Sequence, residues 1–227
     1  MNSSVIIFPG SNCDRDMDVA LKKFGFKNKM IWHDDQELPK SDLVVLPGGF
    51  SYGDYLRCGS MASKSKIVQS VINFAKSGGL LMGICNGFQI LTETELLPGV
   101  LLRNQSSDFI CKNIFVKINN VENNYFKNIK KNTLELHIAH NEGNYFCSDD
   151  QMKKIYDNSQ IALFYCSENG EVNERFNPNG SSKNIAGIFN KEKNILGMMP
   201  HPERMIDKYL SGDDGAIFFE NLLNNLK

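Results

Sequence analysis

The chain has 227 residues, of which 41% are hydrophobic and 22% are charged, values typical of globular domains. Lys and Arg number 25 and Asp and Glu number 26, so the formal net charge is −1. This balance argues against a nucleic-acid-binding protein, which usually carries a basic stripe, and against electrostatic attachment to anionic membranes. The mean hydropathy is −0.31, and no apolar run approaches the roughly 20 residues that a membrane-spanning helix needs.

The N-terminal segment and the cysteines bear on the compartment. The first apolar stretch, residues 5–8, is too short for a signal peptide, and no basic region precedes it, so we expect a cytoplasmic protein. No two cysteines form a C-x-x-C pair, which excludes zinc-ribbon and thioredoxin motifs. We expect all six to be thiols, most of them buried and inert. They are Cys13, Cys58, Cys85, Cys111, Cys147 and Cys166.

The first half of the chain alternates between strand-like and helix-like segments. Apolar runs predict strands at residues 5–8, 29–32, 43–46 and 80–84. Helical spacing of apolar residues predicts amphipathic helices at residues 14–24 and 67–75. Continuous apolar strands that alternate with amphipathic helices indicate a parallel sheet that is covered on both faces.

The second half is less regular. Strands are predicted at residues 113–118, 133–137, 160–166, 185–189 and 194–199, without long helices between them. A last helix is predicted after Asp213 or Asp214 as the cap, with Ile217, Phe218, Leu222 and Leu226 facing inward. We therefore predict an α/β fold whose central sheet is mainly parallel, flanked by helices, and extended by antiparallel strands. No linker is visible, so we expect one domain over residues 1–227.

The most informative segment runs from Gly79 to Leu91 and predicts a strand, a tight turn and a helix. At the turn stands Gly83-Ile84-Cys85-Asn86-Gly87, the G-x-S-x-G pattern of a nucleophile elbow with cysteine in place of serine. Such a turn places Cys85 at a helix N-terminus, where the helix dipole favours the thiolate. The alternative is a buried structural cysteine, but the flanking strand and helix favour a nucleophile.

A cysteine nucleophile needs a base, and His201 is the candidate because it follows a predicted strand within the motif P-H-P-E. The prolines on both sides of His201 predict an extended chain, in which residues i and i+2 face the same side. Glu203 would then bind one ring nitrogen of His201 while the other faces Cys85, giving a Cys-His-Glu triad. The alternative is a surface turn whose His201 and Glu203 are merely solvated.

The other histidines give weaker signals. His137 and His140 would point to opposite faces of a predicted strand, and no further ligands complete a site, so we predict no metal. His33 is expected in a solvated turn.

An acyl-transfer site also needs an oxyanion hole. The backbone N–H groups of Gly49, which follows a predicted strand, and of Asn86 are the candidate donors. The alternative for Gly49 is an ordinary glycine-rich turn.

Together these motifs resemble the class I, triad-type glutamine amidotransferases, over essentially the whole chain. More narrowly, four stretches resemble the family of glutaminase subunits of phosphoribosylformylglycinamidine synthases, which act in purine biosynthesis. The stretches are FPGSNCDRD, PGGFSYGDYLRCGSMA, IAHNEGNY and NPNGSSKNIAGIFNKEKNILGMMPHPER. Asn141 departs from the family, which more often carries glycine there.

The resemblance implies a flavodoxin-like fold and a mechanism. Cys85 attacks the side-chain amide of glutamine, His201 protonates the departing ammonia, and water then hydrolyses a γ-glutamyl thioester. By the same resemblance, Gln89 contacts the backbone groups of the bound glutamine, and His140 with its loop closes over the pocket.

The sequence also implies a partner. It contains no G-x-x-x-x-G-K-[ST] loop for ATP, and ammonia released into bulk water would be protonated and useless as a nucleophile. By resemblance, the partner is a large ATP-dependent synthetase subunit that holds ATP and Mg²⁺, together with a small bridging subunit. We expect no cofactor in this chain. Tyr52, Tyr55 and Arg57 are the predicted interface; alternatively, their segment supports the oxyanion loop without touching a partner.

Three other readings remain open. In the first, the chain is a glutaminase subunit of a different synthetase. In the second, it is a cysteine hydrolase of another family on the same fold. In the third, it is a non-catalytic scaffold. Hydrolases of the second kind lack P-H-P-E, so Glu203 argues against them. The presence of Cys85, His201 and Glu203 together argues against the third reading.

Overall fold

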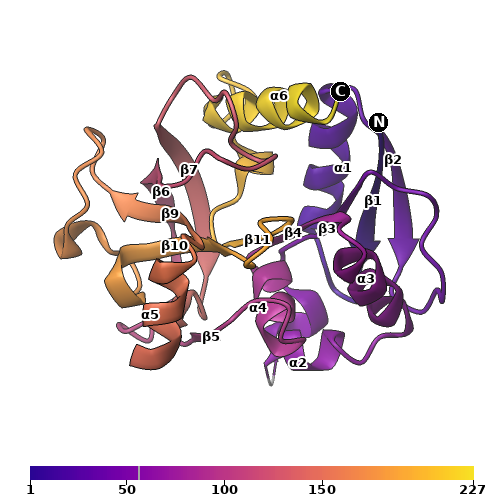
Figure 1. Ribbon diagram of the computed structural model, residues 1–227, viewed down its shortest axis with the longest axis horizontal. Coiled ribbons are helices and arrows are strands. Elements are labelled where there is room, and N and C mark those ends of the chain that lie inside the picture. Colours follow the sequence, from indigo (N-terminus) through magenta and orange to yellow (C-terminus); the bar gives the residue numbers. More distant parts are fainter. Residues whose placement is uncertain (56) are drawn as a thin grey trace.

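A mixed nine-stranded sheet crosses the molecule in this computed structural model, which describes residues 1–55 and 57–227 (Figure 1). The strand order is β2-β1-β3-β4-β11-β10-β9-β6-β7. The first five strands in that order run parallel, and the remaining four continue the sheet with antiparallel pairing. The parallel strands are β2 (Lys27–Trp32), β1 (Asn2–Ile7), β3 (Leu43–Leu46), β4 (Leu80–Ile84) and β11 (Ile195–Met198). The antiparallel strands are β10 (Ile185–Phe189), β9 (Ile161–Cys166), β6 (Ile110–Ile118) and β7 (Thr133–His140).

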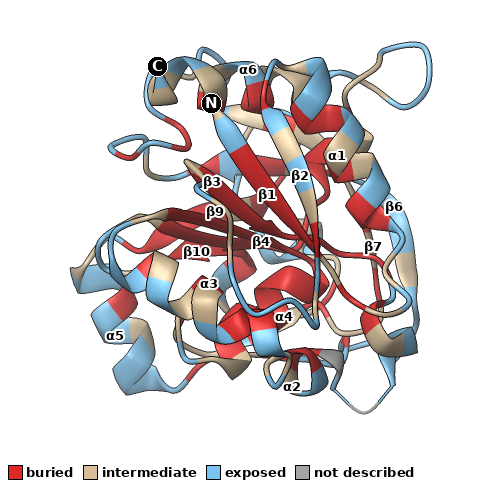
Figure 2. Cartoon of the chain, turned by 90° about the vertical axis from the view of Figure 1, so that its right-hand side faces the viewer, coloured by how far each residue is buried: buried red, intermediate tan, exposed pale blue. Residues whose placement is uncertain are grey.

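Helices cover both faces of this sheet (Figures 1 and 2). On one side lie α1 (Cys13–Lys23) and α6 (Asp214–Leu226), and on the other lie α3 (Lys66–Lys76), α4 (Asn86–Glu93) and α5 (Asp149–Asp157). A short helix, α2 (Cys58–Ala62), packs against α4. The strands β5 (Val100–Leu102) and β8 (Asn144–Phe146) form a separate antiparallel pair. The 3₁₀ helices are η1 (Ser51–Asp54), η2 (Glu174–Phe176), η3 (Ser182–Asn184) and η4 (Pro202–Arg204).

Burial follows from these layers. Every residue of β3, β4, β10 and β11 is buried, because these strands lie in the middle of the sheet under helices on both faces (Figure 2). At the sheet edge, β7 instead alternates between buried and half-buried residues. Among the described residues, no helix is long and apolar enough to cross a membrane.

The predicted architecture, a parallel sheet with an antiparallel extension, is confirmed. The strands predicted at residues 43–46 and 80–84 have the bounds of β3 and β4. The expectation that no long helix interrupts the second half is wrong, because α5 lies between β8 and β9. This helix begins with a capping box in which Ser148 and Gln151 bind each other's backbone, and S-x-x-Q is a signal readable from the sequence.

The last helix begins where it is predicted, but its capping is different. Neither Asp213 nor Asp214 caps α6 through its side chain. The Asp214 carboxylate instead accepts hydrogen bonds from Lys131 Nζ and from the backbone N–H of Glu135, both at 2.6 Å. These bonds tie the start of α6 to β7. Phe219 is fully buried beside the predicted Phe218, whereas Ile217 and Leu226 are only half-buried.

The turn between β4 and α4 depends on Gly87, because a Cβ at this position would overlap the backbone carbonyl of Leu46 in β3. A backbone atom in a central strand cannot move aside cheaply. We expect Gly87→Ala to lower the free energy of unfolding by about 3 kcal/mol, measured by urea denaturation.

Gly78→Ala is the matched control, since a Cβ there meets no atom within 4 Å and only the positive φ of 90° opposes it. It should cost about 1 kcal/mol. Equal losses in the two variants would contradict the close approach of α4 to β3.

Candidate active site

Three adjacent parallel strands bring the candidate catalytic residues together. Gly48 follows β3, Cys85 follows β4 and His201 follows β11, and these strands are neighbours in the sheet. Because parallel strands end at the same edge, their carboxyl ends form the place where open α/β sheets bind ligands. The backbone N–H of Cys85 donates to the carbonyl of Met198 at 2.9 Å, which joins the two strand ends directly.

Cys85 has the backbone of a nucleophile elbow. Its φ is 51° and its ψ is −107°, an unusual conformation for a residue other than glycine, and such conformations concentrate at functional sites. The residue stands directly before α4, at the N-terminal end of that helix. The side chain is only 4% exposed, and its Sγ–H donates weakly to the carbonyl of Ala139 at 3.8 Å.

His201 and Glu203 form a buried pair. The Nδ1–H of His201 donates to Glu203 Oε1 at 2.6 Å, and both side chains are almost completely excluded from water. The chain between them is not extended, as the prolines suggested, but forms the 3₁₀ helix η4. Pro202 occupies the first position of that helix, where its fixed φ and missing N–H are compatible with helical structure. The turn, rather than strand alternation, brings the two side chains together.

The second ring nitrogen of His201, Nε2, is not engaged by Glu203. Nε2 is buried and has no hydrogen-bond partner in the described part of the chain. A Cβ on Gly48 would lie 2.7 Å from His201 Cε1 and 2.9 Å from Cys85 Cβ, so the two side chains pack against the same glycine. Burial alone would lower the pKa of His201, but the Glu203 carboxylate and two neighbouring thiols, those of Cys13 and Cys85, raise it well above its usual value.

Cys13 also lies in the site, a position that was not predicted for it; as expected of most of the cysteines it is buried, and burial raises the pKa of its thiol. Its Sγ and the donor atoms of His201 and Glu203 all lie within 4.8 Å of one another. Within the described part of the chain, this is the group of three donors that is compact enough for a metal ion. Nδ1 of His201 and Oε1 of Glu203 are already joined to each other by their short hydrogen bond. The signal that pointed to Cys13 was its place after the first strand of a parallel sheet.

Of the predicted oxyanion donors, Asn86 directly follows Cys85, and Gly49 follows Gly48, where a Cβ would lie 2.9 Å from Cys85 Cβ. Gly49 has a left-handed φ of 93°, and Asn86 is the first residue of α4. The Asn86 side chain accepts from the N–H of Ser51 at 3.2 Å and donates to Asp54 Oδ1 at 2.8 Å. These contacts fasten the loop after β3 to the start of α4. That the backbone groups bind an oxyanion remains a prediction.

A small cavity of about 20 Å³ opens beside Cys85. Gln89 and His140, the predicted substrate contacts, are both in its wall. The Gln89 amide donates from Nε2 to the carbonyl of Glu142 at 2.9 Å. A cavity of this size has room for about one water molecule, so glutamine needs the wall to move. The lining residues are Asp54, Cys85, Asn86, Gln89, His140, Asn141 and Glu142.

His140 anchors the loop that forms one side of this cavity. Its Nδ1 lies 3.0 Å from Asn104 Oδ1, and Asn179 Nδ2 lies 3.5 Å from its Nε2. Burial, and then the charge of His201, lower the pKa of His140 to about 4, so the ring is neutral near pH 7 and donates from Nδ1. Asn104 also binds the His140 carbonyl and the Gly143 N–H. Nothing in the local sequence around Asn104 signalled this role.

The predicted interface residues differ in their surroundings. Tyr55 is 74% exposed, and Arg57 is exposed and paired with Glu93 at the end of α4. Tyr52 is half-buried, with its hydroxyl 3.0 Å from Ser65 Oγ and 3.4 Å from Nδ1 of His33. His33 is thus half-buried rather than solvated.

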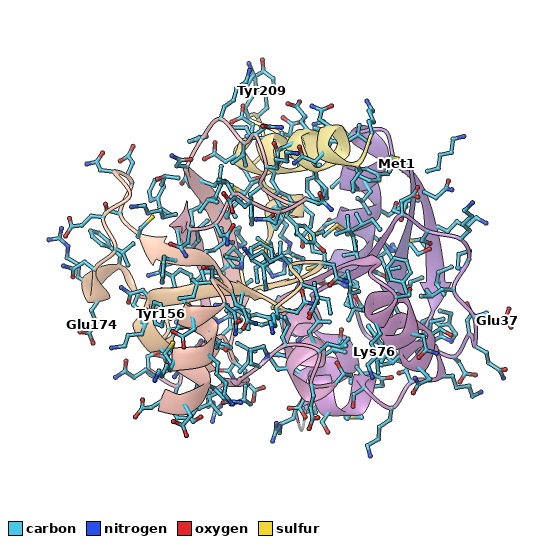
Figure 3. All side chains as sticks on the ribbon, in the orientation of Figure 1. Met1, Glu37, Lys76, Tyr156, Glu174 and Tyr209 are labelled. Carbon is cyan, nitrogen blue, oxygen red and sulfur yellow. The ribbon has the colours of Figure 1, made fainter. Side chains whose placement is uncertain are left out.

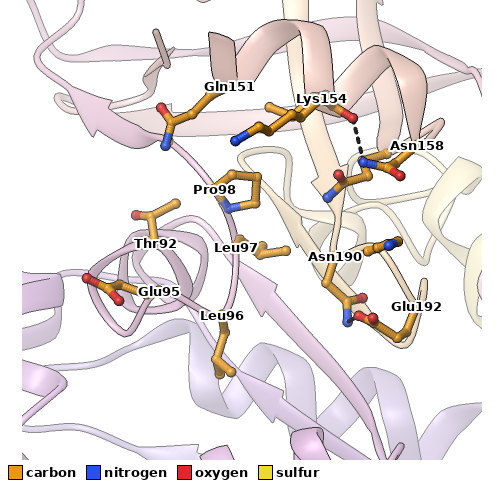
Figure 4. A pocket seen from close by; sticks show the side chains of 14 residues that line it. Thr92, Glu95, Leu96, Leu97, Pro98, Gln151, Lys154, Asn158, Asn190 and Glu192 are labelled. Atoms are coloured by element: carbon orange, nitrogen blue, oxygen red, sulfur yellow. Dashed lines mark hydrogen bonds between the residues drawn. The ribbon is translucent and has the colours of Figure 1, made fainter.

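A larger hollow of about 650 Å³ lies between the end of α4, α5 and the β10–β11 turn (Figure 4). None of the residues proposed for catalysis lines it. Cys85 instead lines the small cavity. Five cysteines are free thiols, and the side chain of Cys58 lies outside the described part of the structure.

Comparisons with known proteins agree with this geometry. The chain is 78% identical over 227 residues to "Phosphoribosylformylglycinamidine synthase subunit PurQ" of Pelagibacter ubique, and the alignment covers 100% of both chains. It is 46% identical over 226 residues to the protein of the same description from Zymomonas mobilis, covering 98% of each chain.

Among solved structures, the chain superposes on one chain of "Structure of PurLQS from Thermotoga maritima" with a TM-score of 0.86 and 40% identity. That superposition covers 100% of this chain and 99% of the other. Residues 1–212 match the family described as the CobB/CobQ-like glutamine amidotransferase domain. The chain therefore belongs to the CobB/CobQ-like glutamine amidotransferase family.

Proposed function

We propose that this chain is the glutaminase subunit of a phosphoribosylformylglycinamidine synthase complex, in which it hydrolyses glutamine to glutamate and ammonia. One observation carries the chemistry: Cys85 sits on a strained strand-to-helix turn and shares a glycine contact with His201, which is paired with Glu203. The full-length identity to the named relatives supports the choice of complex.

The geometry gives each residue a step in this reaction. The Sγ of Cys85 attacks the side-chain amide carbon of glutamine, and its proton passes to Nε2 of His201. Backbone N–H groups of Gly49 and Asn86 stabilise the oxyanion, an effect worth about 10²–10³ in rate per donor in other enzymes. His201 then protonates the departing ammonia. Water, deprotonated by His201, hydrolyses the γ-glutamyl thioester and frees Cys85.

Glu203 keeps its place at Nδ1 throughout. Its carboxylate fixes the tautomer of His201 and offsets the positive charge of the imidazolium, which is shielded from bulk solvent. Gln89 and His140 line the cavity beside Cys85, which supports their proposed contacts with bound glutamine.

The ammonia passes to a partner. We propose that a synthetase subunit with ATP and Mg²⁺ docks near the site, together with a small bridging subunit, and converts formylglycinamide ribonucleotide to formylglycinamidine ribonucleotide.

Residues 1–227 act as one amidotransferase domain, because the sheet draws its strands from both halves of the chain. The free thiols suit a cytoplasmic location.

Replacing the nucleophile tests the assignment directly. Cys85→Ala should abolish glutamine-dependent turnover of the complex while ammonia-dependent turnover survives, because only the glutaminase step uses the thiolate. The measurement compares both activities in the reconstituted complex. A glutamine-analogue electrophile should add mass at Cys85 alone; a label on another cysteine, with Cys85 unmodified, would falsify the assignment.

Replacing His201 should reduce glutaminase activity more than replacing Glu203. His201→Ala should lower kcat/KM for glutamine by at least about 10⁴-fold, and Glu203→Gln should be about 10²-fold milder, because the amide holds the ring without its charge. Since the Glu203 carboxylate raises the pKa of His201, its loss lowers that pKa. The alkaline limb of the pH–rate profile should then move to lower pH. An unchanged profile in Glu203→Gln would remove Glu203 from the mechanism.

The interface is tested by reversing one charge. We propose that docking of the synthetase rearranges residues 48–57, of which Leu56 lies outside the described residues, and opens the small cavity to glutamine. Arg57→Glu should weaken complex formation and glutamine use together, while Cys85 keeps its reactivity toward a small thiol reagent. The measurement titrates the synthetase against glutamate production.

Arg175→Glu is the matched control, since Arg175 is equally exposed and also pairs with a glutamate, in its case Glu171 in a surface turn. It should leave the titration unchanged. Full glutaminase activity of the isolated chain, or an unchanged titration for Arg57→Glu, would overturn this account of the interface.

A further inference from the structure

A second thiol, that of Cys13, lies in the site without a role in the reaction described above. Cys13 is the first residue of α1 and follows β1, which adjoins β3 in the sheet. It is 1% exposed. The backbone N–H of Asn12 donates to the carbonyl of Gly49 at 3.0 Å, so the segment that carries Cys13 is fastened to the loop beside the nucleophile.

The hydrogen bonding of Cys13 leaves its sulfur lone pairs available. Its Sγ–H donates to Asn12 Oδ1 at 3.4 Å, so the thiol proton is directed at a neighbour and not at His201. Burial raises the pKa of Cys13, which keeps it a thiol rather than a competing thiolate. The sulfur can therefore accept a weak hydrogen bond but does not offer a proton to the base.

The two ring nitrogens of His201 differ. Nδ1 is bound to Glu203, while Nε2 is buried and has no hydrogen-bond partner among residues 1–55 and 57–227. When Nε2 takes the proton of Cys85, a positive charge forms where water cannot reach it. The Glu203 carboxylate and the Cys85 thiolate offset this charge, and a further acceptor beside the ring adds to their effect, since a buried charge is costly where its polar contacts are incomplete. The Sγ of Cys13, one ring nitrogen of His201 and one carboxylate oxygen of Glu203 lie within 4.8 Å of one another, which places the Cys13 sulfur beside the His201–Glu203 pair.

We propose that Cys13 is a positioning residue whose sulfur steadies the protonated ring of His201, and thereby keeps Cys85 as a thiolate. A thiol suits this task because it is a weak acceptor with its proton committed to Asn12. A group that donated to Nε2 would stabilise the neutral ring instead, and the proton would stay on Cys85. The proposal rests on the pairing of Cys85 with His201 in the proposed function.

The test follows the thiolate without using glutamine. Iodoacetamide alkylates thiolates, so the rate of modification of the Cys85 peptide, read by mass spectrometry across pH, reports the population of the Cys85–His201 ion pair. In Cys13→Ala, the rate near neutral pH should fall about tenfold, the scale of one charge-assisted hydrogen bond. The full rate should return only at alkaline pH, where Cys85 ionises without help.

Two further variants separate this role from packing. Cys13→Ser, whose hydroxyl can keep its proton on Asn12, should stay within about threefold of the wild type. Asn12→Ala keeps the sulfur but frees its proton to donate to Nε2, so it should slow Cys85 alkylation as Cys13→Ala does. Asn12 makes no side-chain cap to α1, so this change spares the helix. Cys147→Ala, at another buried cysteine, is the control and should change nothing.

The experiment distinguishes failure of the Cys85–His201 pairing from failure of the role proposed for Cys13. His201→Ala should remove the neutral-pH reactivity of Cys85. If it does not, the pairing of Cys85 with His201 is wrong, and the proposed catalytic assignment fails with it. If His201→Ala acts as expected while Cys13→Ala and Asn12→Ala leave the profile unchanged, only the role of Cys13 is overturned. Should Cys13→Ala not fold, Asn12→Ala alone decides.

Discussion

A carboxylate and an imidazole, both excluded from water, share a hydrogen bond of 2.6 Å between Glu203 Oε1 and His201 Nδ1. The rest of the site depends on this contact. In the proposed mechanism it leaves Nε2 of His201 for Cys85, and it supplies the negative charge that makes a buried imidazolium tolerable. Without it, burial would favour the neutral ring, and Cys85 would keep its proton.

The strand order of the sheet brings the other site residues to the Glu203–His201 pair. The strands β1, β3, β4 and β11 are consecutive neighbours, so the loops that follow them meet at one edge. They carry Cys13, Gly48, Cys85 and His201. The antiparallel extension contributes from the other side: the backbone N–H of His201 donates to the carbonyl of His137 in β7, at 2.8 Å. The loop between η4 and α6 carries Tyr209, which is exposed at the top of the molecule in Figure 3.

The parts of the site that are formed by contiguous residues could be predicted from the sequence. The strand before Cys85, the two glycines around it and the helix after it are contiguous in the chain, so the elbow could be read directly. The approach of Cys13 to His201 could not, because 188 positions separate them and only the strand order brings them together. The pairing of His201 with Glu203 was predicted for the wrong reason, since Pro202 starts a 3₁₀ turn instead of an extended segment.

The central claim is that Cys85 carries the acyl group of glutamine during turnover. Rapid acid quenching of the complete complex during glutamine hydrolysis, followed by mass spectrometry of the cysteine peptides, tests it most directly. We expect a γ-glutamyl adduct on the Cys85 peptide that appears within the first turnover and disappears when glutamine is exhausted. Turnover at full rate with no adduct on Cys85, or with the adduct on Cys13, would contradict it.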